Sequence, residues 1–364
     1  MKKKRVIAMY LPQFHPTKDN DEWWGKGFTE WTNVTKAKPL FRKHYQPHLP
    51  TDLGFYDLRV SETRIEQAEM AKQYGIDGFC YYHYWFHGKR LLERPFNEVL
   101  ESKEPNFPFM LCWANESWTR AWDDSEHKIL IKQEYSREDD YNHINYLLSV
   151  FEDPRYIRID GKPVFIIYRS TNIPHLEEMI KFWREEATKK GMELYICRFE
   201  SYGEEGEIYQ KGLFDASLEF QPHSLSKSKY NSKNLGLRAI NKISRSVIGR
   251  NIIKNTRSYP GYVDYISTTP EPSYKCYPCV VPMWDNTARK GRSFFAFVKS
   301  TPQSYKKWLK YALNRKNYSK EENLVIINAW NEWAEGNHLE PCRKWGHQYL
   351  EATKDAIDEY NQGK

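Results

Sequence analysis

The chain has 364 residues, of which 40% are hydrophobic, 28% charged and 16% aromatic, which is typical of a globular protein. Its net charge of +7 comes from an acid-free window between Glu219 and Asp264 that holds nine basic residues, and because no recognisable binding motif accompanies that window we expect no nucleic acid partner. No apolar run approaches the roughly 18 residues of a spanning helix, and the run after the basic start is broken at Pro12, so we expect no membrane span, no secretory leader and a cytoplasmic protein.

Short β-rich runs alternate with helical patterns along the whole chain, which favours a parallel sheet. Most of the β runs are continuously apolar, as expected for strands covered on both faces. The β runs span residues 6–11, 78–86, 108–115, 163–169, 193–199, 216–221, 280–285 and 323–330, and helical periodicity covers residues 61–75, 137–153, 175–191, 301–317 and 345–361.

Eight such alternations predict an α/β fold, a single (β/α)8 TIM barrel over residues 1–364. The basic residues 225–260 form a predicted helical insertion after the sixth strand. A doubly wound open sheet is the second candidate, and it is weakened because no glycine-rich phosphate loop follows the first β run.

The carboxyl ends of the predicted strands carry polar and aromatic side chains. In a (β/α)8 barrel these ends form the face that holds the active site. A barrel with a purely structural role would not need polar groups at every strand end. We therefore predict that a substrate site is formed by His15, His83, Trp85, Asn115, Glu116, Trp118, Tyr168, Asp285, Arg289, Asn331, Glu332, Trp333 and Glu335.

Glu332 and Glu335 are the candidates for catalysis. Cleavage of a glycosidic bond needs a carboxylic acid and a second carboxylate. If the chain bends into a helical or 3-10 turn after the eighth strand, side chains three apart fall on one side. Two close carboxyl groups then split their pKa values, so that one can act as acid and the other as base. The competing interpretation is a solvated acidic loop, which the position after a β run disfavours.

Several of the other candidates have ordinary structural alternatives. Glu116 could form an ion pair with Arg120, and Arg289 could be a surface residue beside Lys290. Histidines such as His83 are more often satisfied hydrogen-bonding residues than catalysts. We expect Glu340, near the end of the same segment, to have a structural role.

The insertion at residues 225–260 has two interpretations. Leu237, Ile240, Ile243 and Val247 fall on roughly one face of a predicted helix, with basic residues on the other faces. A lid helix that packs on the barrel would bury the apolar face, and we favour that interpretation. A basic amphipathic helix could instead lie on an anionic membrane, which would suit a lipid-linked glycan and peripheral contact at the inner membrane.

We expect no cofactor and no metal. The sequence has neither a GxGxxG motif nor a P-loop, so nothing supports nucleotide binding. Cys276 and Cys279 have CxxC spacing, but no two further ligands stand at a suitable distance in the sequence.

Six segments resemble the WbsX-like family, which is described as glycosyltransferases of polysaccharide and O-antigen biosynthesis. The resemblance covers nearly the whole chain, and the family is related in turn to glycoside hydrolase family 99, a (β/α)8 barrel family of endo-acting α-mannosidases. The segments are YLPQFHP, GFTEWTNV, HYQPHLPTDLGFYDL, GIDGFCYYHYWF, CWANESWTR and WNEWAEGNHLEP.

The resemblance to family 99 implies a mechanism and residue roles. Retention of configuration would proceed without a covalent glycosyl-enzyme, through a 1,2-anhydro sugar. Glu332 would be the base on the sugar 2-hydroxyl, Glu335 the acid and then the base, and Arg289 a contact to the sugar. The pattern departs from family 99 at Ala334, Asn337 and His338, where that family tends to have His, Thr and Gln, so mannose specificity is not implied.

Three functions remain open from the sequence. The first is an enzyme of the family 99 type that cleaves or transfers a glycosidic bond on a bacterial surface polysaccharide or its precursor. The second is a glycosyltransferase of O-antigen or capsule biosynthesis that uses an activated sugar donor. The third is a catalytically inactive glycan-binding protein, against which the two intact glutamates argue. In each case the partner is an oligosaccharide or polysaccharide.

Overall fold

The computed structural model describes residues 3–119, 129–200, 203–209, 211–223, 239–240, 242–243, 246–247, 255–291, 294–319 and 322–363. Most of the predicted insertion at 225–260 lies outside the described residues. Within the described part of the chain, no helix combines the length and apolar character that crossing a bilayer requires.

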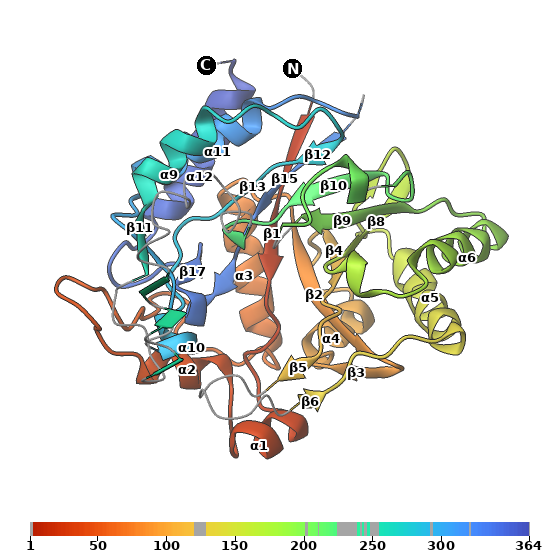
Figure 1. The fold of residues 1–364 in the computed structure, drawn as a ribbon, viewed down its shortest axis with the longest axis horizontal. Coiled ribbons are helices and arrows are strands. Elements are labelled where there is room, and N and C mark those ends of the chain that lie inside the picture. The colour runs from red at the N-terminus through yellow and green to blue at the C-terminus, as the bar shows by residue number, and fades with distance from the viewer. Residues whose placement is uncertain are drawn as a thin grey trace.

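Nine parallel strands form a nearly closed barrel (Figure 1). They are hydrogen-bonded in the order β12, β10, β9, β8, β4, β2, β1, β15, β13. The strands β12 and β13 flank Pro278 and together occupy the seventh position, so the two ends of this order meet. The strands are β1 Lys3–Tyr10, β2 Gly78–Phe86, β4 Phe109–Trp113, β8 Lys162–Ile167, β9 Tyr195–Glu200, β10 Ala216–Glu219, β12 Cys276–Tyr277, β13 Cys279–Val280 and β15 Glu322–Ile327. The predicted TIM-barrel fold is confirmed.

The seventh strand differs from the prediction of residues 280–285. The barrel strand is instead the CYPC segment, and the chain from Val281 onward leads out to the strand ends. Proline has no N–H to give to a ladder, which splits the strand, although the carbonyl of Pro278 still accepts from Ile326 at 2.9 Å. Burial raises the pKa of the Cys279 thiol to about 12. Cys276 and Cys279 are therefore buried, free thiols of the barrel wall.

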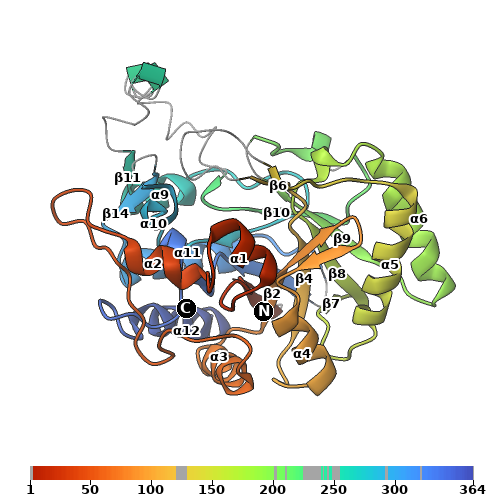
Figure 2. The same cartoon turned by 90° about the horizontal axis from the view of Figure 1, so that it is seen from below.

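Helices surround the barrel, with α11 and α12 on one side and α5 and α6 on the opposite side (Figures 1 and 2). The surrounding helices are α3 Ser61–Gln73, α4 Arg94–Ser102, α5 Arg137–Phe151, α6 Leu176–Lys189, α9 Tyr259–Ser267, α11 Pro302–Asn314 and α12 Gln348–Asn361. Five of these match the predicted helical segments. Between β9 and β10 the described residues contain only the 3-10 turn Glu207–Tyr209.

Local sequence explains where the predicted helices begin and end. The hydroxyl of Thr301 accepts from the backbone N–H of Ser304 at 3.2 Å, and Pro302 takes the first turn of α11, where its missing N–H costs nothing. Gly75 follows α3 with a φ of +85°, a conformation that glycine adopts without strain. Ser61 is the first helical residue of α3, and Val60 precedes it as the N-cap.

Small elements decorate the carboxyl ends of the barrel strands. Three of them are helices, α1 Lys18–Trp24, α2 Glu30–Lys36 and α10 Thr287–Lys290. The 3-10 turns Ser170–Asn172 and Trp333–Glu335 follow barrel strands β8 and β15. Short strand pairs at these ends are formed by β3 Lys89–Leu91 with β2, β5 Trp118–Thr119 with β6 Ile129–Ile131, β11 Thr256–Ser258 with β14 Ala296–Val298, and β16 Asn331–Glu332 with β17 Asn337–His338. In contrast, β7 Arg158–Ile159 pairs with the first residues of β8, at the amino end of that strand.

Candidate active site

A cleft of about 520 Å³ lies at the carboxyl ends of the barrel strands. Its walls combine acids, bases and aromatic rings, the mixture expected for a ligand site on this face of a barrel. Of the predicted site residues, six line it: Glu116, Trp118, Tyr168, Arg289, Glu332 and Glu335.

Glu332 and Glu335 reach the cleft from one tight turn after the eighth barrel strand. The 3-10 turn Trp333–Glu335 begins right after Glu332 and ends at Gly336, which has a φ of +53°. The predicted bend is therefore present, and it directs both carboxyl groups into the same space. The backbone carbonyl of Glu335 accepts a 2.6 Å hydrogen bond from the N–H of Asp285, which ties the turn to the segment after the seventh strand.

One guanidinium bridges the two glutamates. Arg289, in α10, donates from Nη1 to Oε1 of Glu335 at 2.7 Å and from Nη2 to Oε2 of Glu332 at 3.3 Å. Nη2 also donates to Oε1 of Glu30 at 2.7 Å. Three carboxyl groups therefore share a single guanidinium as their hydrogen-bond donor.

The cleft raises the pKa of both glutamates. Burial raises the pKa of Glu332 to about 8, with repulsion from Glu335 adding to it and Arg289 opposing it. Burial also raises the pKa of Glu335, while Arg289 lowers it. Because Arg289 lies closer to Glu335, that carboxyl is the better stabilised as an anion, and Glu332 is the better holder of a proton. A pair with one protonated and one ionised member is what acid–base chemistry requires.

Glu116, Trp118 and Tyr168 occupy the opposite part of the cleft. Burial raises the pKa of Glu116, and its Oε1 lies 3.8 Å from Nε of Arg169. The alternative partner, Arg120, lies outside the described residues. The Trp118 ring packs edge-on against Tyr84, with ring centroids 5.1 Å apart.

His83 and Trp85 do not line the cleft. They point outward from β2 to α5, where Nε2 of His83 contacts Nε2 of His143 at 3.0 Å and Nε1 of Trp85 donates to Asp139 at 2.9 Å. Successive side chains of a strand face opposite sides. The cleft-facing residues of β2 are instead the alternate ones, including Tyr82 and Tyr84.

Asn331 and Asn115, both predicted for the site, instead form hydrogen bonds with the backbone of a neighbouring strand end. Oδ1 of Asn331 accepts from the N–H of Leu11 at 2.8 Å while its Nδ2 donates to the same residue's carbonyl at 3.0 Å. Asn115 makes the equivalent pair of bonds to Arg169, at 2.8 Å each. Both side-chain amides are thus occupied in joining strand ends, so these residues shape the cleft without lining it.

Trp333 and Asp285 lie behind the glutamates. The Trp333 ring stacks on His338 at 3.8 Å between centroids and donates to Oε2 of Glu340 at 2.6 Å. The carboxylate of Asp285 contacts Nε2 of His44 at 2.6 Å. Since their polar atoms face away from the cleft-lining set, these residues support the turn and do not contact the cleft. The hydrogen bonds to Glu340 fit the structural role expected of it.

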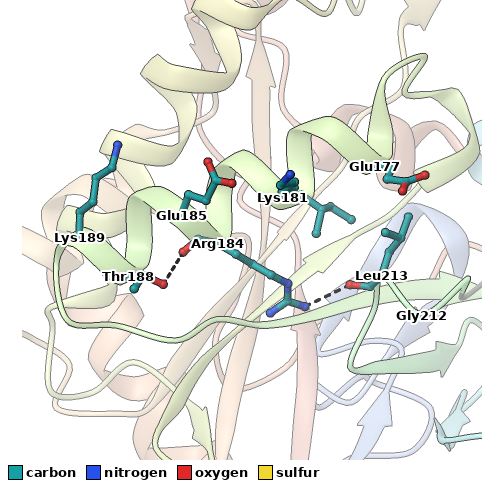
Figure 3. A pocket seen from close by; sticks show the side chains of 9 residues that line it. Glu177, Lys181, Arg184, Glu185, Thr188, Lys189, Gly212 and Leu213 are labelled. Atoms are coloured by element: carbon teal, nitrogen blue, oxygen red, sulfur yellow. Dashed lines mark hydrogen bonds between the residues drawn. The ribbon is translucent and has the colours of Figure 1, made fainter.

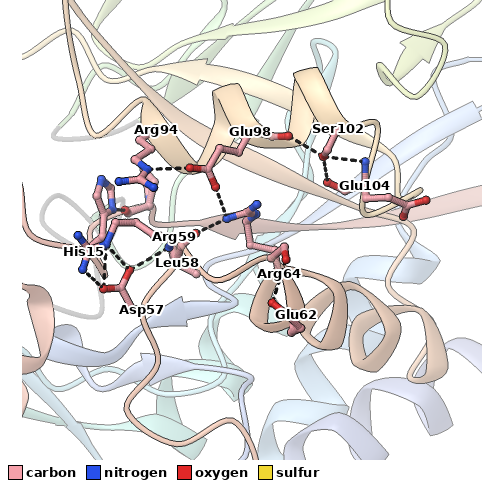
Figure 4. A network of polar contacts seen from close by, with 12 residues as sticks. His15, Asp57, Leu58, Arg59, Glu62, Arg64, Arg94, Glu98, Ser102 and Glu104 are labelled. Carbon is pink, nitrogen blue, oxygen red and sulfur yellow. Dashed lines mark hydrogen bonds and ion pairs between the residues drawn. The ribbon is translucent and has the colours of Figure 1, made fainter.

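His15 also lies away from the cleft. Its Nδ1 is 3.0 Å from the carbonyl of Pro12, and Figure 4 shows the ring in a charged network with Asp57, Arg59 and Arg94. Burial lowers the pKa of His15 to about 4. The ring therefore belongs to the packing between the first strand end and the helices beneath it.

Several cleft residues were not predicted from the sequence. The most consequential is Glu30, which is 1% exposed and contacts Arg289. Glu30 lies in the family-like segment GFTEWTNV, but nothing local places it in the cleft, and the apolar run of β2 does not show that Tyr82 and Tyr84 face inward. The other cleft residues outside the predicted set are Leu11, Gln13, Trp24, Ala114, Ser117, Thr119, Leu130, Phe220, His223, Trp284, Asn286 and Lys290.

A second hollow, of about 720 Å³, lies along α6 (Figure 3). The guanidinium of Arg184 spans it to the carbonyls of Leu194 and Leu213, at 2.9 and 3.1 Å. Its charges come from the outer face of one helix, far from the strand ends, and its acids do not converge. The cleft at the strand ends is therefore the candidate active site. Among the residues described, no set of three or more His, Cys, Asp or Glu side chains is arranged to hold a metal ion.

Solved structures share this fold. A glycoside hydrolase-like protein gives a TM-score of 0.59 at 15% identity, over 98% of this chain and 94% of that one. The family 99 endo-alpha-mannosidase from Bacteroides thetaiotaomicron, in complex with bis-tris-propane, gives 0.58 at 14% identity, over 100% and 99%. At such identities the likeness concerns the barrel fold.

Sequence comparison identifies closer relatives. The uncharacterized protein WxcX of Xanthomonas campestris pv. campestris is 37% identical over 355 residues, in each of two strains. The match covers 97% of this chain and 49% of WxcX, so the chain spans about half the length of these relatives.

The family model for glycosyltransferase WbsX matches residues 6–353. Since the model spans nearly the whole described barrel, the chain belongs to the WbsX glycosyltransferase family.

Proposed function

We propose that the chain cleaves or transfers a glycosidic bond in a surface polysaccharide or its precursor, with Glu332 and Glu335 as the acid–base pair. The observation that carries the proposal is the shared guanidinium of Arg289, which joins both carboxyl groups inside a cleft at the barrel's active face. Aromatic walls that include Trp118 and Tyr84 suit the flat faces of sugar rings.

The proposed reaction needs one proton donor and one base. The protonated carboxyl gives its proton to the leaving oxygen as the bond to the anomeric carbon breaks. The ionised carboxyl removes the proton of the sugar 2-hydroxyl, whose oxygen closes on the anomeric carbon to form the 1,2-anhydro sugar. Water or an acceptor hydroxyl then opens that ring, and the protons return in the opposite sense. Two inversions at the anomeric carbon amount to retention.

The resemblance to family 99 gives the acid role to Glu335, whereas the charges in the free protein favour a proton on Glu332. These assignments are separated by the leaving group. A glycosyl fluoride needs little protonation to depart, so it restores turnover to a variant that lacks the acid and not to one that lacks the base. We expect Glu332→Gln and Glu335→Gln to respond differently to fluoride donors, and the restored variant identifies the acid.

The proposal is tested by turnover of bacterial polysaccharides and lipid-linked oligosaccharides. Glu332→Gln and Glu335→Gln should each reduce product formation by at least about 100-fold, the lower end of what a positioned proton donor or acceptor contributes. Glu98→Gln is the matched control, because Glu98 forms an ion pair with Arg64 at 2.8 Å and does not line the cleft. Unchanged turnover in either active-site variant would remove that residue from the mechanism.

Transfer from a nucleotide sugar is the second candidate, and the family's name favours it. Thermal shift against a panel of nucleotide sugars distinguishes it from hydrolysis. Stabilisation by one sugar nucleotide, lost in Arg289→Met, would favour an activated donor. Release of reducing ends without any acceptor would favour water.

We also propose that residues 225–260 contact an anionic membrane surface. Most of this segment lies outside the described residues, but Ile240, Ile243 and Val247 are described and are 43, 64 and 75% exposed. A lid helix packed on the barrel would bury the helix face that carries these three side chains. Co-sedimentation with phosphatidylglycerol vesicles should fall in Ile243→Asp and with rising salt, with phosphatidylcholine vesicles as the control. Equal sedimentation of both proteins would contradict the contact.

A further inference from the structure

Glu30 is a third carboxyl group in the cleft, and it comes from the opposite end of the chain. It opens α2, and its backbone N–H donates to the carbonyl of Gln13 at 3.0 Å, which fixes the helix start to the segment leaving β1. The side chain is 2% exposed. A carboxyl so well buried needs a charged or hydrogen-bonding partner, and Arg289 is that partner at 2.7 Å.

Sharing one guanidinium makes the three carboxyl groups unequal. Nη1 of Arg289 has a single acid partner in the cluster, Glu335 at 2.7 Å. Nη2 serves two, with Glu30 at 2.7 Å and Glu332 at 3.3 Å. The short bond to Glu30 therefore leaves Glu332 with the longest and weakest of the three ion pairs. If Glu30 did not hold Nη2, that nitrogen would be free to approach Glu332.

We infer that Glu30 is a positioning residue, which takes one edge of Arg289 and so leaves Glu332, in place of Glu335, as the carboxyl that keeps the proton. The inference rests on the proposed acid–base role of the pair. Glu30 acts on Glu332 in two ways. Glu30 withdraws the guanidinium from Glu332, and its own negative charge opposes a second one nearby. Burial raises the pKa of Glu332, and repulsion from Glu335 and Glu30 adds to it. Repulsion from Glu30 also raises the pKa of Glu335, so the difference between the two carboxyl groups comes from how they share Arg289.

Other charged and titratable groups around the pair leave this assignment in place. Burial raises the pKa of Glu335, Arg289 opposes that rise, and Lys290, next to Arg289 on α10, also favours the ionised form. Two tyrosines of β2 interact with Glu332 and stay neutral, since burial raises their pKa values well above 10. The groups around the pair are Glu30 from α2, Tyr82 and Tyr84 from β2, and Arg289 and Lys290 from α10, with the Asp285–His44 pair behind the turn. Glu116, Tyr168 and His223 are the other titratable groups that line the cleft.

The test is a pH titration of the free protein with ¹³C-labelled glutamate, in which NMR monitors the carboxyl resonances. Loss of a signal in Glu332→Gln or Glu335→Gln assigns the two resonances. In Glu30→Gln we expect the midpoint of Glu332 to fall by about one pH unit, the lower end of what a nearby charge produces. Glu98→Gln also loses an ion pair to a buried arginine, and its Glu332 midpoint should stay at the wild-type value. Equal midpoints in Glu30→Gln and Glu98→Gln would overturn the inference.

A second variant keeps the test valid if Glu30→Gln does not fold. Glu30→Asp retains the charge but draws it back from Nη2, so it should move the Glu332 midpoint in the same direction by a smaller amount. No movement in a folded Glu30→Asp would count against the inference as well.

The pH profile of turnover supplies an independent readout. Because the acid must be protonated, the alkaline limb of kcat/KM should move to lower pH in Glu30→Gln, by the same interval as the NMR midpoint. A purely structural role for Glu30 would lower the amount of folded protein without moving the limb. If the midpoint moves but turnover does not depend on Glu332 or Glu335, the proposed function fails and the role of Glu30 stands. If turnover depends on both but the midpoint is fixed, the role of Glu30 fails alone.

Discussion

Gly336 ends the turn that carries both glutamates, and replacing it with alanine tests how tightly that turn is held. Its φ of +53° is unfavourable for any residue with a β-carbon. A β-carbon would also lie 3.0 Å from both Cβ and the carbonyl oxygen of Asp285 and 3.2 Å from its backbone nitrogen. Two of these are backbone atoms, and the same backbone donates the 2.6 Å hydrogen bond to Glu335. The clash can therefore be relieved only by moving the two segments apart.

Two costs add in Gly336→Ala. The left-handed conformation costs about 1–2 kcal/mol for a residue with a β-carbon, and forcing an extra methyl group into a packed site typically costs about 1–3 kcal/mol. Gly346 is the matched control, because its φ is +51° and nothing lies within 4 Å of its β-carbon position. Gly346→Ala should therefore lower the free energy of unfolding only by the conformational cost of about 1–2 kcal/mol.

Urea unfolding followed by tryptophan fluorescence measures both variants, and we expect Gly336→Ala to be less stable than Gly346→Ala by about 1–3 kcal/mol. Displacing Glu335 by a few tenths of an ångström should also lower glycan turnover by about tenfold or more, while Gly346→Ala keeps wild-type turnover. Equal losses of stability in the two variants would refute the argument that close approach to Asp285 requires glycine here.

Three further predictions concern buried groups around the cleft. Glu340→Gln should lower the free energy of unfolding by about 2 kcal/mol, because the NH2 group of the new glutamine would face donors such as Nε1 of Trp333. A loss measured by urea unfolding that is no larger than that of surface variants would contradict this prediction. Arg289→Met should lower stability by about 3–5 kcal/mol at neutral pH. This loss of stability should shrink as the pH falls from 8 toward 4.5. The folded-state pKa values of the cleft glutamates lie above their unfolded values, so protonation removes the repulsion between the carboxylates of the variant. A loss of stability that calorimetry finds independent of pH would exclude this cause. Tyr84→Leu should weaken oligosaccharide binding by about 1 kcal/mol, whereas Trp85→Leu should lower the free energy of unfolding by about 3 kcal/mol and leave affinity unchanged. If titration calorimetry showed that only Trp85→Leu weakens binding, the inward side of β2 would be wrongly assigned.

The barrel could be predicted because its elements are local. Seven of the eight predicted β runs coincide with barrel strands, and the five predicted helices are all present. A continuous apolar run can only be buried on both faces, and helical periodicity can only pair one face with the sheet. The exception is the seventh strand, which is formed by the CYPC segment on both sides of Pro278 and not by the predicted residues 280–285.

The candidate site could be predicted only in part. Glu332, Glu335 and Arg289 follow directly from strands seven and eight, so their place at the strand ends could be inferred. His83 and Trp85 also stand near a strand end but face α5, because a one-residue difference in a strand reverses the side of the sheet. The apolar run in β2 does not alternate in polarity, so the sequence holds no sign of which side is inward.

The sequence by itself determined which segments become strands and helices, because local patterns of apolar residues indicate which segments are buried. It also determined that two glutamates follow the last barrel strand. The tertiary structure alone decided that Arg289 would be shared with Glu30, a residue 259 positions away in the chain. Barrel closure brings the segment after the first strand beside those after the seventh and eighth, and no local pattern encodes that meeting. The division of charge between Glu332 and Glu335 arises there, in a buried cluster with fewer positive groups than carboxyl groups.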